Sequence, residues 1–453
     1  MIETIDPTTG LVLERIPLMD PQQIDATLEK ASRSVRSWGA TSLDERASLL
    51  RAVAARLRAD RDALATTAVR EMGKPIVQAR AEVEKCASAL EYFAEHGAAM
   101  LAPQPAASSA ARSYVAFRPL GVVLAIMPWN FPYWQVVRAA APALMAGNAL
   151  VLKHAANTSR CALELGRVFR DAGAPDGLFG VLIARGDSMG RVVADPRIAA
   201  VTLTGSELAG AAVARTAGEN LKKCVLELGG SDAFVVFADA DLDAAASTAV
   251  TARFQNNGES CIAAKRFIVE APAYDDFVAR FVERTRAQVV GNPMEERVQL
   301  GPCARGDLRE TVHQQVEATI DRGARLALGG HLLEGAGFFY EPTIVSDVVP
   351  GTRMFDEEVF GPAAAVVRAD DRENALALAN ASQYGLGSSV WTSDVAAAEA
   401  IAARVEAGAV FINGMVASDP RLPFGGVKKS GYGRELSSFG IHEFVNVQTV
   451  WIG

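Results

Sequence analysis

The chain has 453 residues, enough for two or three domains of about 100–200 residues each. Lys and Arg total 45 against 53 Asp and Glu, and the net charge of −8 leaves no basic footprint for nucleic acid or an anionic membrane. Half of the residues are hydrophobic, which excludes general disorder, and the five scattered cysteines argue against a disulfide framework or a zinc ribbon and predict a reducing, cytoplasmic location.

The first hundred residues have a helical pattern. Helices are predicted over 20–39 and 42–73, which open with Asp-Pro and with the capping box Ser-x-x-Glu, and over 76–96. The polar, β-branched stretch 108–120 is expected to form an exposed hairpin strand. The uncharged stretch 119–137 contains three prolines, so we predict buried strand and loop there and no membrane span.

From residue 121 onward, short apolar runs alternate with helical stretches such as 159–172 and 206–217. The apolar runs are predicted to be buried strands, over 122–126, 149–152, 178–183, 199–203 and 233–237, and in a second set over 266–270, 363–367, 388–391 and 409–413. Repeated strand–helix–strand units predict parallel sheets. The fold class is therefore α/β, with two closely packed domains of similar size.

The usual dinucleotide fingerprint, G-x-G-x-x-G after a strand, is absent. The nearest candidate is Thr204-Gly205-Ser206, which follows an apolar run and opens a helix. Free amides at that helix start could hold a phosphate, although many loops of this kind have only a Gly and a Ser cap.

Three other positions are candidates for catalysis. Cys261 follows a polar, Gly-containing loop, and a thiol nucleophile needs an accessible loop and a base nearby. Glu227 ends an apolar strand, where it is either a buried base with a raised pKa or a salt-bridge partner. Asn130 is either a turn residue or an oxyanion donor.

Together these motifs resemble the aldehyde dehydrogenase superfamily over nearly the whole chain. They occur in the order Pro128-Trp-Asn-Phe-Pro, Lys153, Thr204-Gly-Ser, Glu227-Leu-Gly-Gly, Gly258-x-x-Cys261, Glu358-Val-Phe-Gly-Pro and Pro423-Phe-Gly-Gly-Val-Lys-Lys-Ser-Gly. Within the superfamily the chain is most similar to short bacterial succinate-semialdehyde dehydrogenases, through 127–138, Leu152-Lys-His-Ala, 227–232 and Val416-Ala-Ser-Asp.

The resemblance implies two doubly wound α/β domains, a Rossmann-like cofactor domain and a catalytic domain, plus a small β oligomerisation arm. The cofactor domain would comprise 1–100 and 120–228, and the catalytic domain 229–429. The arm and tail would be 101–119 and 430–453, with the tail adding a strand to a partner subunit. A homodimer or homotetramer is expected.

The resemblance also implies roles for single residues. Cys261 attacks the aldehyde, Asn130 and the Cys261 amide hold the oxyanion, hydride leaves to the nicotinamide, and Glu227 activates the hydrolytic water. Each oxyanion donor of this type is worth roughly 2.7–4 kcal/mol. The cofactor-binding residues would be Trp129, Lys153, Ala156, Thr204, Gly205, Ser206, Leu228, Glu358 and Phe360. No metal site is predicted.

The resemblance also implies a cofactor preference and a substrate. Ala156 stands where NAD-selective relatives tend to have a Glu, so NADP⁺ is expected to be preferred, with NAD⁺ usable. The substrate would be an anionic aldehyde, succinic semialdehyde first, with its carboxylate on Arg138. Ser418 would add a hydrogen bond, Trp134 would line the pocket, and Arg421 is the reserve cation.

Two residues depart from the family pattern. Glu259 stands where Gln is usual, and a carboxylate near the sulfur would raise the thiol pKa unless it points away. Ser231 replaces a common Lys. The alternatives are a dehydrogenase for another small semialdehyde such as glutarate semialdehyde, a cofactor-independent thiol esterase, and a silent scaffold of the same fold.

Overall fold

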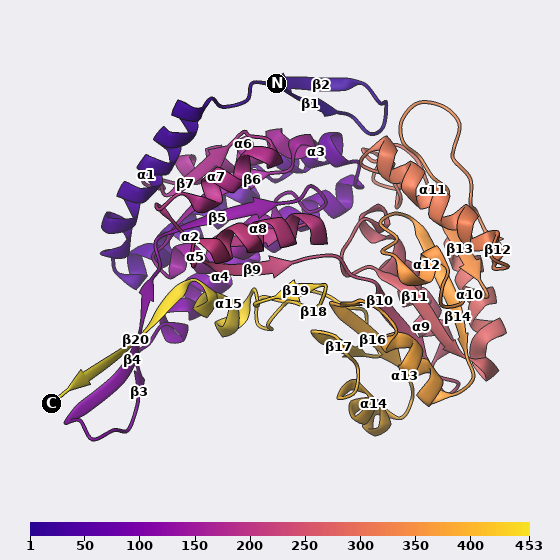
Figure 1. The fold of residues 1–453 in the computed structure, drawn as a ribbon. Helices are drawn as coiled ribbons and strands as arrows, with labels where there is room; N and C mark the ends of the chain where they lie inside the picture. Colours follow the sequence, from indigo (N-terminus) through magenta and orange to yellow (C-terminus); the bar gives the residue numbers. More distant parts are fainter.

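The computed structural model describes residues 1–453. Two open sheets lie side by side, and a small β arm projects away from the first of them (Figure 1). A hairpin of β1 (Ile2–Ile5) and β2 (Val12–Ile16) precedes the first helix. None of the helices has the length and the apolar character needed to cross a membrane.

The first sheet has the strand order β19-β9-β8-β5-β6-β7, and all its strands except β19 are parallel. These strands are β5 (Val122–Met127), β6 (Ala149–His154), β7 (Phe179–Leu182), β8 (Ile198–Thr204), β9 (Lys223–Glu227) and β19 (Gly431–Tyr432). Because parallel strands are buried on both faces, they appear in the sequence as continuous apolar runs, and four of the predicted runs coincide with β5, β6, β7 and β8. The fifth run of the first predicted set, 233–237, lies in the second sheet.

Helices pack around this sheet: α1 (Pro21–Gly39), α2 (Leu43–Ala59), α3 (Arg61–Met72), α4 (Ile76–Met100), α5 (Trp134–Met145), α6 (Ser159–Asp171), α7 (Met189–Ala194) and α8 (Glu207–Glu219). The capping box predicted at the start of α2 is present, and α1, predicted from Asp20-Pro21, also begins with one. The predicted single helix over 42–73 is wrong in one respect, because it breaks at Asp60 into α2 and α3. The Asp60 carboxylate accepts hydrogen bonds from Arg56 and from Arg167 of α6, which holds the break.

The second sheet has the strand order β12-β13-β14-β11-β10-β16-β17. Its strands are β10 (Asp232–Val236), β11 (Ala264–Glu270), β12 (Arg325–Leu328), β13 (Thr343–Ser346), β14 (Ala363–Ala369), β16 (Gly387–Trp391) and β17 (Ala409–Ile412). Side chains of β10 alternate between two separate apolar clusters, Ala233 and Val235 in one, Phe234 and Val236 in the other. This sheet is therefore covered on both faces.

The covering helices are α9 (Leu242–Phe254), α10 (Tyr274–Arg286), α11 (Gly306–Ile320), α12 (Arg353–Asp356), α13 (Arg372–Asn380) and α14 (Val395–Ala402). A two-stranded sheet of β15 (Tyr384–Gly385) and β18 (Val427–Lys428) lies outside the main sheet. With α/β units in both halves, the predicted fold class is confirmed.

The arm consists of β3 (Gln104–Pro105), β4 (Arg112–Pro119) and β20 (Val445–Ile452), with β4 in the middle. The C-terminal segment does more than build this arm. Its strand β19 pairs with β9 of the first sheet, and α15 (Ser437–Glu443) packs against α4 and α5. Residues 430–444 therefore pack against the first sheet and its helices within their own chain. Of the C-terminal segment, only β20 belongs to the arm (Figure 1).

The strand order of the first sheet creates a crevice at its carboxyl edge. The chain runs from β5 to β6 and β7 on one side, and then returns to β8 and β9 on the other. Ligands of open α/β sheets bind where the order reverses in this way. Residues 228–231 lead directly from β9 into β10, so the second sheet begins beside the same crevice.

Candidate active site

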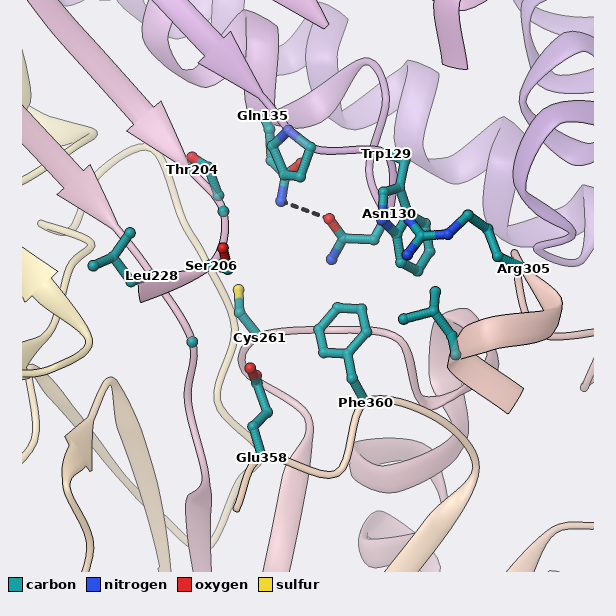
Figure 2. Close-up of a pocket in the computed structure, with 14 residues that line it drawn as sticks. Trp129, Asn130, Gln135, Thr204, Ser206, Leu228, Cys261, Arg305, Glu358 and Phe360 are labelled. Carbon is teal, nitrogen blue, oxygen red and sulfur yellow. Dashed lines mark hydrogen bonds between the residues drawn. The ribbon is translucent and has the colours of Figure 1, made fainter. Parts of the chain in front are cut away.

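Loops at the carboxyl ends of β5, β8 and β9 meet segments that surround the second sheet, and together they enclose a cavity of about 370 Å³. We call it the first cavity. Figure 2 shows the Cys261 thiol pointing into its centre. The cavity is lined by Pro128, Trp129, Asn130, Gln135, Thr204, Gly205, Ser206, Leu228, Gly229, Cys261, Arg305, Leu308, Glu358 and Phe360. The structure thus brings together nine of the predicted catalytic and cofactor positions, whereas Lys153, Ala156 and Glu227 lie outside its lining.

The loop that carries Cys261 has an unusual backbone. Asn256, Asn257 and Gly258 are three consecutive residues with positive φ, at 55°, 59° and 71°. Asn and Gly tolerate this conformation better than other residues. The Asn257 side chain holds the loop in place, since it donates to the carbonyls of Gly73 and Pro302 and accepts from the Gly301 amide. The sharp turn lets Cys261 face the cavity.

The electrostatic surroundings of the thiol are mixed. Burial raises the pKa of Cys261 to about 11, the nearby cations of Arg138 and Lys265 oppose this, and the carboxylates of Glu358 and Glu227 add to it. Lys265 is fully buried and donates to the carbonyl oxygens of Ser260 and Cys261 at 2.8 and 2.6 Å. The thiol form therefore predominates near neutral pH, and attack on a substrate requires that its proton be removed.

The Asn130 amide is oriented by its neighbour Gln135. Gln135 Nε2 donates to Asn130 Oδ1 at 3.1 Å (Figure 2), which directs Asn130 Nδ2 to the opposite side, where it donates to the Glu259 carbonyl at 3.0 Å. The backbone amide of Cys261 has no hydrogen-bond acceptor in the chain. An oxyanion formed on a carbon attached to the sulfur would offer an acceptor to both donors, which is the arrangement of an oxyanion hole.

Glu227 is buried at the end of β9, and neither of its carboxylate oxygens has a hydrogen-bond partner. Burial and the neighbouring carboxylate of Glu435 raise its pKa well above the ordinary value, against the opposing charges of Arg138 and Arg434. One oxygen lies against Gly425, where a Cβ would approach it to 2.7 Å. A raised pKa suits a carboxylate that must take a proton from water.

Glu259, which stands where the family usually has Gln, has a carboxylate that is directed towards Ala304. Its carboxylate accepts the Ala304 amide at 2.9 Å, and its charge adds to burial in raising the pKa of Cys303. The charges that shift the pKa of Cys261 most are those of Arg138, Lys265, Glu358 and Glu227. The Glu259 carboxylate is therefore directed towards the Ala304 amide and not towards the Cys261 thiol.

A second cavity of about 360 Å³ meets the first at Gln135 and Cys261. Its lining includes the predicted substrate positions Trp134, Arg138 and Ser418. The reserve cation Arg421 is not part of it: its side chain is 74% exposed and is bound to Asp419. The structure therefore does not support Arg421 as a substrate-binding residue. A thiol between two cavities can react with a molecule in one while a reagent occupies the other.

The first cavity suits a nicotinamide dinucleotide. It opens beside the N-terminus of α8, where Ser206 caps the helix and free amides can meet a diphosphate. Trp129 and Phe360 meet edge to face at 5.6 Å beside the thiol, and the Glu358 carboxylate accepts the Gly230 amide. Lys153 lies near the end of β6, half-buried and without an ion pair, and the small side chain of Ala156 is exposed just beyond it.

Sequence reasoning missed several lining residues. Gln135 and Arg305 border the first cavity, and Lys85 borders the second. Gln135 had a usable signal, since it is a polar residue in the apolar segment after Asn130. Lys85 had none, because it lies in a helix of mixed polarity, far in sequence from every motif.

The aldehyde dehydrogenase family model matches residues 1–450. The chain is 51% identical over 448 residues to the succinate semialdehyde dehydrogenase [NAD(P)⁺] Sad of Escherichia coli K12, covering 99% of this chain and 97% of the relative. It is 49% identical over 454 residues to succinate-semialdehyde dehydrogenase [NADP⁺] 1 of Mycobacterium bovis, covering 100% and 99%.

A solved structure supports the same assignment. The crystal structure of succinic semialdehyde dehydrogenase from Streptococcus pyogenes with NADP⁺ superposes with a TM-score of 0.97 at 38% identity, and the match covers all of both chains. Identities of this size over the whole length agree with the family match. This chain belongs to the aldehyde dehydrogenase family.

Proposed function

We propose that this protein oxidises succinic semialdehyde to succinate with NAD(P)⁺. The observation that carries the proposal is the position of Cys261 at the junction of two cavities, one suited to a dinucleotide and one bordered by cationic side chains. The names of its relatives in Escherichia coli and Mycobacterium bovis support the same substrate.

The residues of the chain divide the work as follows. The Cys261 sulfur bonds to the aldehyde carbon, and Asn130 Nδ2 and the free Cys261 amide stabilise the oxyanion of the thiohemiacetal. Glu227 takes a proton from the water that later cleaves the thioester. Trp129, Phe360 and Glu358 border the nicotinamide end of the first cavity, and Thr204, Gly205, Ser206 and Leu228 its α8 end.

A bound nicotinamide dinucleotide supplies the two-electron oxidant. The thiohemiacetal carbon loses its hydrogen with two electrons and becomes a thioester, and water then replaces the sulfur and frees the thiol. In total, aldehyde, oxidised dinucleotide and water give carboxylate, reduced dinucleotide and two protons.

An aldehyde panel tests the substrate assignment. With NADP⁺ in excess, kcat/KM is expected to be highest for succinic semialdehyde, lower for the five-carbon glutarate semialdehyde, and lower again for butanal, which has four carbons and no charge. The formation of reduced cofactor is measured by absorbance. A higher value for glutarate semialdehyde would assign the chain to that substrate, and ester cleavage without any cofactor-dependent oxidation would indicate a thiol esterase.

The second feature of the proposed function is a preference for NADP⁺ over NAD⁺. Ala156 provides room beside Lys153 for a 2′-phosphate and places no carboxylate there. Replacing Ala156 with Glu is expected to lower the ratio of kcat/KM for NADP⁺ to that for NAD⁺ at least about tenfold, because like charges in contact cost several kcal/mol.

The matched control is Ala156→Gln, which has the same shape without the charge and should change the ratio much less. Dissociation constants for the two cofactors, measured without aldehyde, report the same effect independently of catalysis. A wild-type enzyme that uses NAD⁺ alone would contradict this cofactor assignment.

We also propose that the protein acts as a cytoplasmic homo-oligomer. The arm supports this proposal, because β20 is an edge strand on which Val447, Trp451 and Ile452 are exposed. The five free cysteines suit a reducing compartment.

A further inference from the structure

Lys265 is a fully buried lysine close to the nucleophile, and it borders neither cavity. It is the second residue of β11, four positions after Cys261. Its Nζ donates to the carbonyl oxygens of Ser260 at 2.8 Å and of Cys261 at 2.6 Å, and lies 3.4 Å from Oε1 of Glu358. An ammonium has three donors, and here it meets three acceptors. The side chain is therefore fully committed to the nucleophile loop and to the carboxylate beside it.

The contact with Ser260 affects the amide of Cys261, because the Ser260 carbonyl and the Cys261 N–H belong to one peptide unit. The chain has no cis peptide bond, and in a trans peptide the C=O and N–H groups point in opposite directions. The Ala263 amide also donates to the Ser260 carbonyl, at 3.1 Å. Two donors thus hold the oxygen end of this peptide, which leaves its N–H, the amide without an acceptor in the chain, pointing away from Lys265.

The contact also polarises the peptide. A hydrogen bond accepted by a carbonyl strengthens the hydrogen bond donated by the same amide by about 10–30%. The positive charge of Lys265 acts on the sulfur in the same direction, since it opposes the rise that burial causes in the pKa of Cys261. Both effects favour negative charge at the nucleophile and on a group bound to it.

Two carboxylates support the buried charge of Lys265. Burial lowers the pKa of Lys265, while Glu358 and Asp232 oppose that shift. Glu358 also accepts the Gly230 amide at 3.0 Å, and a Cβ at Gly230 would approach the Cys261 carbonyl oxygen to 2.6 Å. The segment that joins the two sheets therefore packs directly against this cluster, which keeps the ammonium in place.

We infer that Lys265 is a positioning residue that orients and polarises the Ser260–Cys261 peptide, so that the N–H of this peptide stabilises the oxyanion of the adduct. This inference rests on the proposed covalent oxidation and deepens it. In the addition step the thiol loses its proton to solvent, the S–C bond forms, and the π electron pair of the carbonyl moves to its oxygen. The negative charge develops where the Cys261 amide can donate to it, and Lys265 acts on that charge only through the peptide.

The test compares two reactions of Cys261 in full-length Lys265→Met. Oxidation of succinic semialdehyde in a single turnover passes through the oxyanion and is followed by the formation of reduced cofactor. Alkylation of the cofactor-free enzyme by iodoacetamide, followed by mass spectrometry of the Cys261 peptide, forms no oxyanion. A smaller thiolate fraction slows both reactions alike, so the ratio of the two rates reports the oxyanion.

Lys265→Met is expected to slow oxidation at least about tenfold more than alkylation, because loss of a whole oxyanion donor costs about 10²–10³ in kcat. Lys265→Gln has a side chain of the same length that retains a neutral donor. It should keep a larger part of the wild-type ratio than Lys265→Met does.

Lys222→Met is the matched control. Lys222 also donates to two main-chain carbonyls, those of Val193 and Asp195, but it lies outside both cavities. Both of its rates should stay near those of the wild type. Thermal unfolding and the dissociation constant of NADP⁺ check that each variant keeps its fold and its cofactor site. If Lys265→Met does not fold, Lys265→Gln is compared with the wild type by the same ratio.

The outcomes separate this inference from the proposed function. A wild-type enzyme that reduces no cofactor with any aldehyde would refute the proposed oxidation, whatever the Lys265 variants do. A wild-type enzyme that oxidises succinic semialdehyde, with oxidation and alkylation slowed equally in the folded Lys265 variants, would show that Lys265 affects only the thiol or the loop. That result would overturn its role in the oxyanion site.

Discussion

Replacing Cys261 with Ala is expected to abolish aldehyde oxidation, with a loss of at least about a thousandfold in kcat, because no other group lies where the two cavities meet and can bond to the substrate carbon. Gln135, the only other residue shared by the two cavities, has an amide that is not a nucleophile. Formation of reduced cofactor measures the loss. Fluorescence titration with NADP⁺ should show that the cofactor still binds beside Trp129.

Cys224→Ala is the matched control for this change. Burial raises the pKa of Cys224 to about 11, as it does for Cys261, but Cys224 lies on β9 outside both cavities. It should retain wild-type activity. If Cys261→Ala kept more than a few per cent of wild-type activity, covalent catalysis by this thiol would be wrong.

Replacing Glu227 with Gln is expected to slow hydrolysis of the thioester by about 10²–10⁴-fold, because general base catalysis contributes that much. Oxidation of the first substrate molecule should be affected less. Rapid mixing of enzyme, cofactor and aldehyde should then give a burst of reduced cofactor close to one per active site, followed by a slow steady state.

The burst distinguishes the two steps that Glu227 could assist. If the burst itself slowed as much as the steady state, Glu227 would act in thiol activation and not only in hydrolysis. The buried carboxylate has no hydrogen-bond partner, so the Gln variant replaces it without breaking an internal hydrogen bond. A change in thermal stability is therefore not expected to explain the loss.

Local patterns in the sequence predicted the elements on which the site is built. The apolar runs became the strands β5, β6 and β8, and the motifs at the carboxyl ends of β5, β8 and β9 meet around Cys261 in the first cavity. This succeeds because buried parallel strands need continuous apolar residues, and because their following loops gather at one edge of the sheet. The expected family followed from the same motifs.

Local sequence patterns could not predict contacts between residues that are far apart in the sequence. Whether Arg138 is free depends on Glu435, and whether Glu259 disturbs the thiol depends on the Ala304 amide it accepts. The break at Asp60 likewise depends on Arg167 of another helix. In each case the residue type was evident, whereas its partner was set by packing.

The sequence by itself therefore determined the fold class and the family, and it predicted which residues line the first cavity around Cys261, since these depend on local composition and on motifs that stay together along the chain. The tertiary structure alone decided which charges are already paired. Lys85 and Ser418 are 333 residues apart, and only the packing of α4 against the C-terminal loop brings them together. Charge pairing depends on distance in space and on burial, so only the folded chain shows that Arg138 has an ion-pair partner and Lys85 has none.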